Sequence, residues 1–288
     1  MTFGSAQTTK WILTLGVAFT SSIGAQQPGP PPESPSPIQD NSFLIEEAYN
    51  QPAGVVQHIN TFSLDRDGKS WAYSFTQEWP LFSQRHQLSY TLPVERNGSP
   101  LNTGVGDIGL NYRYQLPTGR DHTLAVAPRL SLLIPTGAVR TGRGSGGAGA
   151  QFNLPVSAMI SPTMVTHFNA GTTYTPSAEN ASGDRGATMS FNAGQSLIWL
   201  ARPVLNFMLE LAYTSTDALL EDGGNARTNE LVLAPGLRGA INLPSGLQIV
   251  PGIAIPFGIG TSRGERSLFF YVSFEHSFTR TRDGGSDD

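Results

Sequence analysis

Apolar and polar residues alternate along residues 267–278, which read S-L-F-F-Y-V-S-F-E-H-S-F. One face of this segment is apolar and aromatic, with Leu268, Phe270, Val272, Phe274, His276 and Phe278. The other face is mostly polar, with Ser267, Ser273, Glu275 and Ser277, and its two exceptions are Phe269 and Tyr271. A period of two residues predicts a β-strand with one apolar and one polar face. The strand is longer than the usual soluble strand of about five or six residues.

The same alternation recurs in about twelve segments between residues 55 and 278. Leu209 and Leu211, for example, flank Glu210, and Tyr112 precedes Arg113. The first segment, residues 55–64, has no clear alternation, so its two faces cannot be assigned from the pattern. The repeated period of two predicts an all-β, antiparallel protein.

The connections between these segments alternate in length. Short ones are expected at residues 80–85, 117–121, 161–163, 202–203 and 243–246, and longer ones at 96–104, 135–147, 176–186, 215–227 and 258–266. Only residues 65–69 are short where this scheme requires a long connection. Short turns at one rim and long loops at the other predict a transmembrane β-barrel of about 12 strands, with short periplasmic turns and long outer loops. The strand at residues 267–278 then resembles the terminal strand of an outer-membrane barrel.

Composition supports a membrane barrel over a helical membrane protein. Hydrophobic residues make up 39% of the chain and charged residues 14%, against about 25% charged in globular proteins. A helical span needs about 20 continuous apolar residues, whereas alternating faces average out. The absence of cysteine excludes disulfides, thiolate zinc sites and a lipid anchor on cysteine. The net charge of −4 argues against a nucleic-acid partner.

The first residues predict export. Lys10, a short apolar run and small residues ending at Ala25 are the parts of a secretory signal peptide over residues 1–25, with an uncleaved anchor as the alternative. Export of this kind is consistent with an outer-membrane location. Residues 26–54 form a Pro-rich segment in which Asp40 or Asn41 is expected to cap one helical turn through Tyr49. This segment is either a plug of the barrel 55–278 or, as we favour, a lead-in beneath the first strand. Residues 279–288 are a polar tail.

Charged residues on the polar faces are candidates for lining a pore. The expected pore-lining residues are Asp107, Arg113, Arg129, Glu210, Glu230 and Arg238. Pairing across residues 117–121 is expected to bring Asp107 close to Arg129. They form either an eyelet of opposed charges that selects solutes, which we favour slightly, or an ion-paired core that fills the lumen. Bulges are expected at five prolines within strands, namely Pro93, Pro128, Pro155, Pro235 and Pro251.

The sequence contains no pattern typical of an enzyme. The Gly-rich residues 142–149 lack the Lys-Ser/Thr ending of a phosphate loop, and the five histidines lack zinc-site spacing. No His and Ser share one strand face in an H-x-S pattern, since His276 and Ser277 are adjacent. We therefore expect no catalytic residue, cofactor or metal site.

Three short motifs add a resemblance to a known family. They are S-F-L-I-E-E-A-Y-N-Q at residues 42–51, V-V-Q-H at 55–58 and Y-V-S-F-E-H-S-F at 271–278. With them the chain resembles outer-membrane transporters described as phenol-degradation (meta-pathway) barrel proteins. The resemblance implies passage of small solutes, including aromatic or hydrophobic compounds, and no catalytic residue. The expected partners are outer-membrane lipid, small solutes and, through the terminal strand, the barrel-assembly machinery. A structural or adhesive barrel with a closed lumen and a barrel hydrolase are the alternatives.

Overall fold

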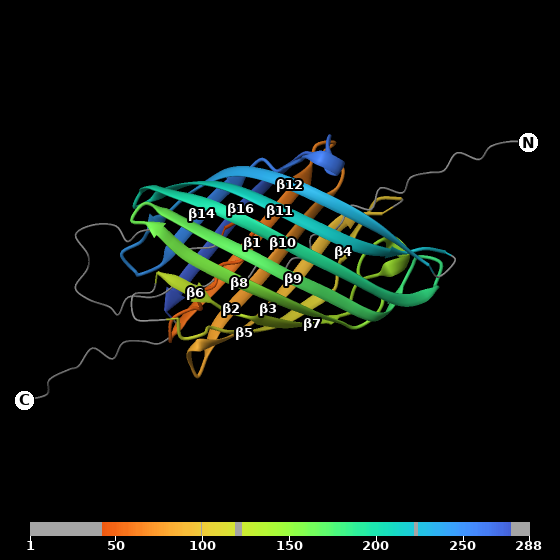
Figure 1. The fold of residues 1–288 in the computed structure, drawn as a ribbon, viewed down its shortest axis with the longest axis horizontal. Coiled ribbons are helices and arrows are strands. Elements are labelled where there is room, and N and C mark those ends of the chain that lie inside the picture. The colour runs from red at the N-terminus through yellow and green to blue at the C-terminus, as the bar shows by residue number, and fades with distance from the viewer. Residues whose placement is uncertain (1–41, 99, 119–122, 222–223, 278–288) are drawn as a thin grey trace, which may run out of the picture.

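A computed structural model describes residues 42–98, 100–118, 123–221 and 224–277. It is a twisted antiparallel sheet that closes on itself (Figure 1). Within these ranges no helix is long and apolar enough to span a bilayer. The predicted signal peptide, the expected capping residues Asp40 and Asn41 and the predicted polar tail lie outside the described residues. The strands are β1 (Val55–Asp65), β2 (Trp71–Leu81), β3 (Ser83–Asn97), β4 (Asn102–Val105), β5 (Ile108–Tyr114), β6 (Leu124–Val126), β7 (Arg129–Ile134), β8 (Gly149–Ser161), β9 (Met164–Glu179), β10 (Arg185–Arg202), β11 (Leu205–Leu219), β12 (Asn225–Gly239), β13 (Ile241–Asn242), β14 (Gln248–Ala254), β15 (Phe257–Gly258) and β16 (Ser267–Ser277).

The barrel has 12 strands, which confirms the predicted fold class. Four strands are each divided into two pieces, β4 with β5, β6 with β7, β12 with β13, and β14 with β15, so the elements outnumber the crossings. Closure comes from β1 and β16, which pair along their whole length from Val55↔Ser277 to Asp65↔Ser267. No strand edge is left open at this seam, so every crossing has two neighbours.

Prolines explain three of these four divisions. The gap between β4 and β5 faces Pro93, whose carbonyl accepts a hydrogen bond from the Gly106 N–H at 3.0 Å. Pro155 faces the gap between β6 and β7, and Pro235 the gap between β14 and β15, with the same one-sided bond. Because proline has no N–H to donate, the ladder loses a bond there. At Pro155 and Pro235 the register is the same on both sides of the gap, so the bulges expected there are wrong. At Pro93 the register changes between Thr91↔Gly109 and Val94↔Val105, so the partner strand carries one extra residue and the expected bulge is confirmed.

The two ends of the barrel differ, as predicted. We call the end where β8 meets β9 and β10 meets β11 the turn rim, because those connections are two residues long. The opposite end, the loop rim, carries the connection from β7 to β8, which includes the 3-10 helix η1 (Val139–Thr141). A second, η2 (Gly260–Ser262), lies between β15 and β16. The loops expected at residues 176–186 and 215–227 are mostly strand, because β9–β12 continue past the barrel body (Figure 1).

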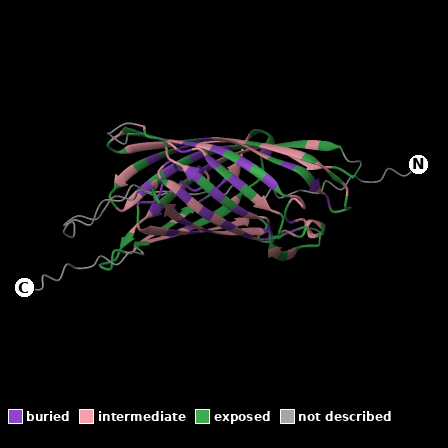
Figure 2. Ribbon diagram, turned by 90° about the horizontal axis from the view of Figure 1, so that it is seen from below, coloured by how far each residue is buried: buried purple, intermediate pink, exposed green. Residues whose placement is uncertain are grey.

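The outer face of the barrel is an apolar surface. Buried and exposed residues alternate along the strands (Figure 2), and many of the exposed ones are large apolar side chains. They include Leu130, Leu132, Phe152, Phe168, Trp199, Phe207, Leu209, Leu211, Leu237, Ile253 and Phe270. A soluble monomer rarely exposes an apolar surface that continues around its girth. The alternation therefore places the apolar set outside and the polar set in the lumen.

Two features of the sequence pattern receive an explanation. Phe269 and Tyr271, the aromatic exceptions on the polar face of β16, are buried inside the lumen at 6% and 2% exposure. In β1 the inward row contains Gln57 and Ile59, which are buried at 0% and 1%, so this row mixes polar and apolar residues. The mixed row is the reason that β1 shows no clear alternation.

Candidate functional site: a lumen filled by residues 42–51

The segment that precedes β1 lies inside the barrel. Ser42, Phe43, Glu46, Asn50 and Gln51 are all completely buried at 0% exposure. Residues 42–51 form bends rather than a helical turn, so the expected turn through Tyr49 is wrong. Their position in the lumen also differs from that of a lead-in beneath the first strand. We refer to residues 42–51 as the lumen segment.

The backbone of the lumen segment is bonded to side chains of the barrel wall. Glu210 of β11 accepts hydrogen bonds from the N–H groups of Phe43 and Leu44, at 3.1–3.2 Å. The Asn169 amide both accepts from the Glu46 N–H at 2.6 Å and donates to the Glu46 carbonyl at 2.7 Å. A buried peptide group without a partner is costly. The inward polar residues therefore stabilise this segment in a non-strand conformation.

Further along the segment, backbone N–H groups are hydrogen-bonded to side chains of other strands. The N–H groups of Ala48, Asn50 and Gln51 donate to Ser157 Oγ, Gln115 Oε1 and Gln87 Oε1, at 2.8, 2.8 and 2.7 Å. At the other end, Ser42 Oγ donates to Ser196 Oγ at 2.7 Å. The segment is thus attached to β3, β8, β9, β10 and β11, as well as to residue 115 just after β5, and it crosses the lumen from one wall to the other.

An apolar socket receives Phe43. Its ring lies 5.6 Å from the ring of Phe269 and 5.5 Å from that of Tyr271. Two glycines provide the space, because a Cβ on Gly252 would lie 2.5 Å from the Phe43 ring and one on Gly236 would lie 2.7 Å from it. Aromatic burial of this kind is a large stabilising contribution. Ile45 meets Gly194 of β10 in the same way.

On the opposite wall the segment meets two arginines. Arg129 of β7 donates from Nε to both oxygens of the Glu46 carboxylate at 3.0 Å. Arg113 of β5 donates from Nη1 to Glu46 Oε1 at 3.3 Å, and Asn153 donates to Oε2 at 2.6 Å. The lumen segment therefore places its phenyl ring on the apolar wall and its carboxylate on the basic wall.

Four of the six expected pore-lining residues are gathered around this segment. Arg113, Arg129, Arg238 and Glu210 have exposures of 1%, 1%, 2% and 0%. Arg238 follows Gly236 on the same inward face of β12, and its charge interacts with that of Glu210. The side chains form one buried polar layer with the segment, so both signs of charge are present in it.

Asp107 and Glu230 lie elsewhere. Asp107 is at the loop rim, where it accepts hydrogen bonds from Gly137 N and from the N–H and hydroxyl of Ser145, at 3.0, 2.7 and 2.7 Å. Glu230 belongs to the inward row of β12 but lies toward the loop rim, opposite Thr214 of β11. Among the residues that the structure describes, neither side chain is hydrogen-bonded or ion-paired to the lumen segment.

The expected proximity of Asp107 and Arg129 is wrong. In the register of β5 with β7, Arg113 pairs with Arg129 and Ile108 pairs with Ile134, so Asp107 lies at the other end of β5. The prediction assumed a turn at residues 117–121 that joins two continuous strands. In the structure the chain re-enters the sheet as β6, and β7 begins only after the gap at Pro128. The carboxylate that meets Arg129 comes from outside the barrel strands and was missed.

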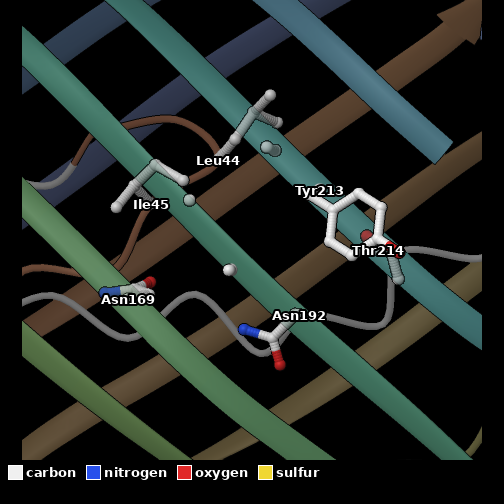
Figure 3. A pocket seen from close by; sticks show the side chains of 9 residues that line it. Leu44, Ile45, Asn169, Asn192, Tyr213 and Thr214 are labelled. Carbon is white, nitrogen blue, oxygen red and sulfur yellow. The ribbon is translucent and has the colours of Figure 1, made fainter. Parts of the chain in front are cut away.

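A small pocket adjoins the lumen segment. Leu44 and Ile45 form one side of it, and Asn169, Asn192 and Thr214 from three strands form the other (Figure 3). Gly194 and Ala212 complete the inner wall. The lumen beside the segment is therefore lined by small and polar groups.

A Ser–His pair forms across two strands, so an H-x-S pattern within one strand does not include it. Ser157 Oγ of β8 lies 2.7 Å from His167 Nδ1 of β9, and both are buried. Ser157 also accepts the Ala48 N–H, and the charged group that interacts with His167 is Arg238, a cation. Hydrolytic triads instead orient the imidazole with a carboxylate. The pair serves here as an attachment point for the lumen segment.

The sequence matches no protein-family model and no curated protein, so the resemblance to phenol-degradation barrel proteins is not confirmed. Solved structures do match. An outer membrane channel from Pseudomonas putida F1 aligns with a TM-score of 0.63 and 12% identity, covering 81% of this chain and 98% of that one. The NanC porin aligns with a TM-score of 0.52 and 11% identity, covering 75% and 98%. At this identity the likeness concerns the fold, and the chain has the fold of an outer-membrane β-barrel.

Proposed function

We propose that this protein is an outer-membrane channel for small solutes, in which the lumen segment is the gate. The observation that carries this proposal is a charged, polar barrel interior occupied by a segment that belongs to no strand. The apolar outer face supports contact with lipid, since alternation with apolar residues outside is the pattern of membrane barrels. The channel and porin neighbours support the same assignment.

The bonds of the lumen segment suit a gate. Its backbone is bonded to side chains such as Asn169 and Glu210, not to the strand ladder. Water can replace these hydrogen bonds at a small net cost, typically about 0.5–1.5 kcal/mol for each bond. The barrel ladder, including the β1–β16 seam, does not depend on the segment. The segment can therefore leave while the barrel remains closed.

The apolar and the basic walls of the lumen suggest which solutes pass through the channel. Departure of Phe43 opens the socket of Phe269 and Tyr271, which offers aromatic contact to apolar or aromatic solutes. The basic wall offers contact to charged or polar solutes. We propose that export by a signal peptide and recognition of the terminal strand by the assembly machinery bring the chain to the outer membrane.

A second candidate is a structural barrel whose lumen stays closed. The observation in its favour is the complete burial of the lumen segment. A hydrolase is the third candidate, and the charge that acts on His167, which is that of the cation Arg238 and not of a carboxylate, argues against it.

Conductance separates these functions. The purified full chain is inserted in planar bilayers, and a liposome-swelling screen over sugars, amino acids and phenols follows. We expect discrete conductance steps and swelling with small solutes. No conductance, under conditions in which a known porin conducts, would favour the closed barrel.

A further inference from the structure

The carboxylate of Glu46 is bound by the barrel wall as a ligand would be. Arg129 Nε donates to both of its oxygens at 3.0 Å, Asn153 Nδ2 donates to one at 2.6 Å, and Arg113 Nη1 to the other at 3.3 Å. The three donor residues are each 1% exposed. Guanidinium groups recognise the planar, two-oxygen shape of a carboxylate as well as its charge. We call Arg113, Arg129 and Asn153 the carboxylate cradle.

Barrel residues fix the orientation of Arg129 independently of the lumen segment. Its Nη1 donates to Asn111 Oδ1 at 3.1 Å and its Nη2 donates to Gln151 Oε1 at 2.9 Å. These bonds leave the Nε edge directed at Glu46. Because Asn111 and Gln151 belong to β5 and β8, they keep this edge in place when the segment leaves.

The charge of the cradle changes when the segment leaves. Arg113 and Arg129 are close to two carboxylates, Glu46 and Glu78, and Glu78 Oε2 lies 3.9 Å from Arg113 Nη2. Glu78 belongs to β2 and stays with the wall. Removal of Glu46 therefore leaves two cations with one anion in a narrow lumen, where an unpaired charge is costly. An anion from solution is then favoured in the position of Glu46.

We propose that the carboxylate cradle binds the carboxylate group of small organic acids, and that Glu46 is an internal competitor for the same position. This inference deepens the proposed channel function, since it relies on the segment leaving the lumen. It identifies the solute class as small carboxylates, with opening promoted by the solute that passes.

Propionate is a suitable probe, because it reproduces the side chain of Glu46, and propionamide is its neutral counterpart. In the full-length Glu46→Ala variant, we expect sodium propionate to raise the Tm with saturation, since a ligand that binds only the folded state stabilises it. Propionamide and equal sodium chloride should not raise it. The Glu46→Ala/Arg129→Gln variant should lose the effect. Ser42→Ala, which loosens the same segment away from the cradle, should not gain it.

A second measurement covers the case in which Glu46→Ala does not fold. The chain contains no cysteine, so Ser42→Cys, a nearly isosteric change at a buried position, supplies a single thiol on the lumen segment. Propionate should accelerate maleimide labelling of this thiol several-fold over propionamide. Equal labelling in both, or a Tm rise that chloride reproduces, would overturn the proposal.

These outcomes are separate from those of the proposed function. Stabilisation and labelling need no solute to cross the barrel, so an absence of conductance would reject the channel while leaving the cradle testable. Conductance without any effect of propionate would retain the channel and reject the cradle.

Discussion

Arg113 on β5 lies directly opposite Arg129 on β7, so two guanidinium groups face each other in the buried lumen. Like charges in this position normally destabilise a strand pair. The Glu46 carboxylate lies within 3.3 Å of both and converts the repulsion into an ion-paired cluster. The electrostatic stability of these two arginines is therefore coupled to a segment that precedes the barrel, whereas the backbone ladder between β5 and β7 is formed by barrel residues alone.

The first prediction follows from this coupling. Glu46→Ala removes the shared carboxylate and should lower the free energy of unfolding by about 3–5 kcal/mol, because it leaves buried charge uncompensated. Urea unfolding in lipid vesicles measures this loss. Glu179→Gln is the matched control, since Glu179 pairs with a 63% exposed Arg185 at the loop rim, and such pairs contribute at most about 1 kcal/mol. Similar losses for both variants would contradict the buried role of Glu46.

A second prediction concerns the glycine socket. Gly252→Ala places a methyl group 2.5 Å from the Phe43 ring, so it should displace the lumen segment and raise the basal conductance. Phe43→Ala removes the ring and the conflict, at a cost of about 3–5 kcal/mol for the lost packing. The free energy of unfolding of the double variant Phe43→Ala/Gly252→Ala should therefore be only slightly lower than that of Phe43→Ala alone. Additive effects in this cycle would mean that Phe43 does not occupy the socket.

Lipid contact gives a third prediction. Leu209 is 45% exposed on the outer face, so Leu209→Arg should destabilise the folded barrel by about 2–4 kcal/mol if it lies near the bilayer midplane. Thr214→Arg is the inner control, because Thr214 lines the polar pocket (Figure 3). Met208 is unsuitable as a control, since it is 4% exposed within the apolar cluster around Phe43. Folding titrations in vesicles that rank Thr214→Arg as the more costly change would reverse the assignment of faces.

Orientation in the membrane is the fourth prediction. An epitope tag after Gly183 at the loop rim should be reached by antibodies on intact cells, because long loops face outward in such barrels. A tag after Gly246 at the turn rim should be reached only after permeabilisation. Both glycines have positive φ and no atom within 4 Å of an added Cβ, so neither insertion disturbs packing. The opposite labelling pattern would invert the topology.

The strands were predictable from the sequence because a period of two is a local signal, and residues 205–219 carry it clearly. The lumen segment was not, since residues 42–51 have no period and are held by side chains from distant strands. A signal was present in the inward rows, where Phe269 and Tyr271 interrupt the polar face of β16 and where Gly236 and Gly252 leave space for a ring. The charged lumen residues were predicted only in part. The alternation of apolar and polar positions shows which face of a strand carries Arg113 and Arg129, but it does not give the register between the strands. Their partner Glu46 precedes the barrel and lies on no strand.

The last prediction tests whether the lumen segment is the gate. Ser42 Oγ on the segment lies 2.7 Å from Ser196 Oγ on β10, so the Ser42→Cys/Ser196→Cys variant should form a disulfide between groups that already touch. A disulfide needs Cβ atoms about 3.5–4.5 Å apart, and the absence of other cysteines leaves no competing partner. Under oxidising conditions the segment is then fixed in the lumen, and conductance in planar bilayers should fall to background. Addition of dithiothreitol should restore it, whereas the single variant Ser42→Cys should respond to neither condition. Full conductance from a protein whose disulfide has been verified by mass spectrometry would mean that solutes pass without movement of this segment, and the gate would have to be sought elsewhere in the barrel.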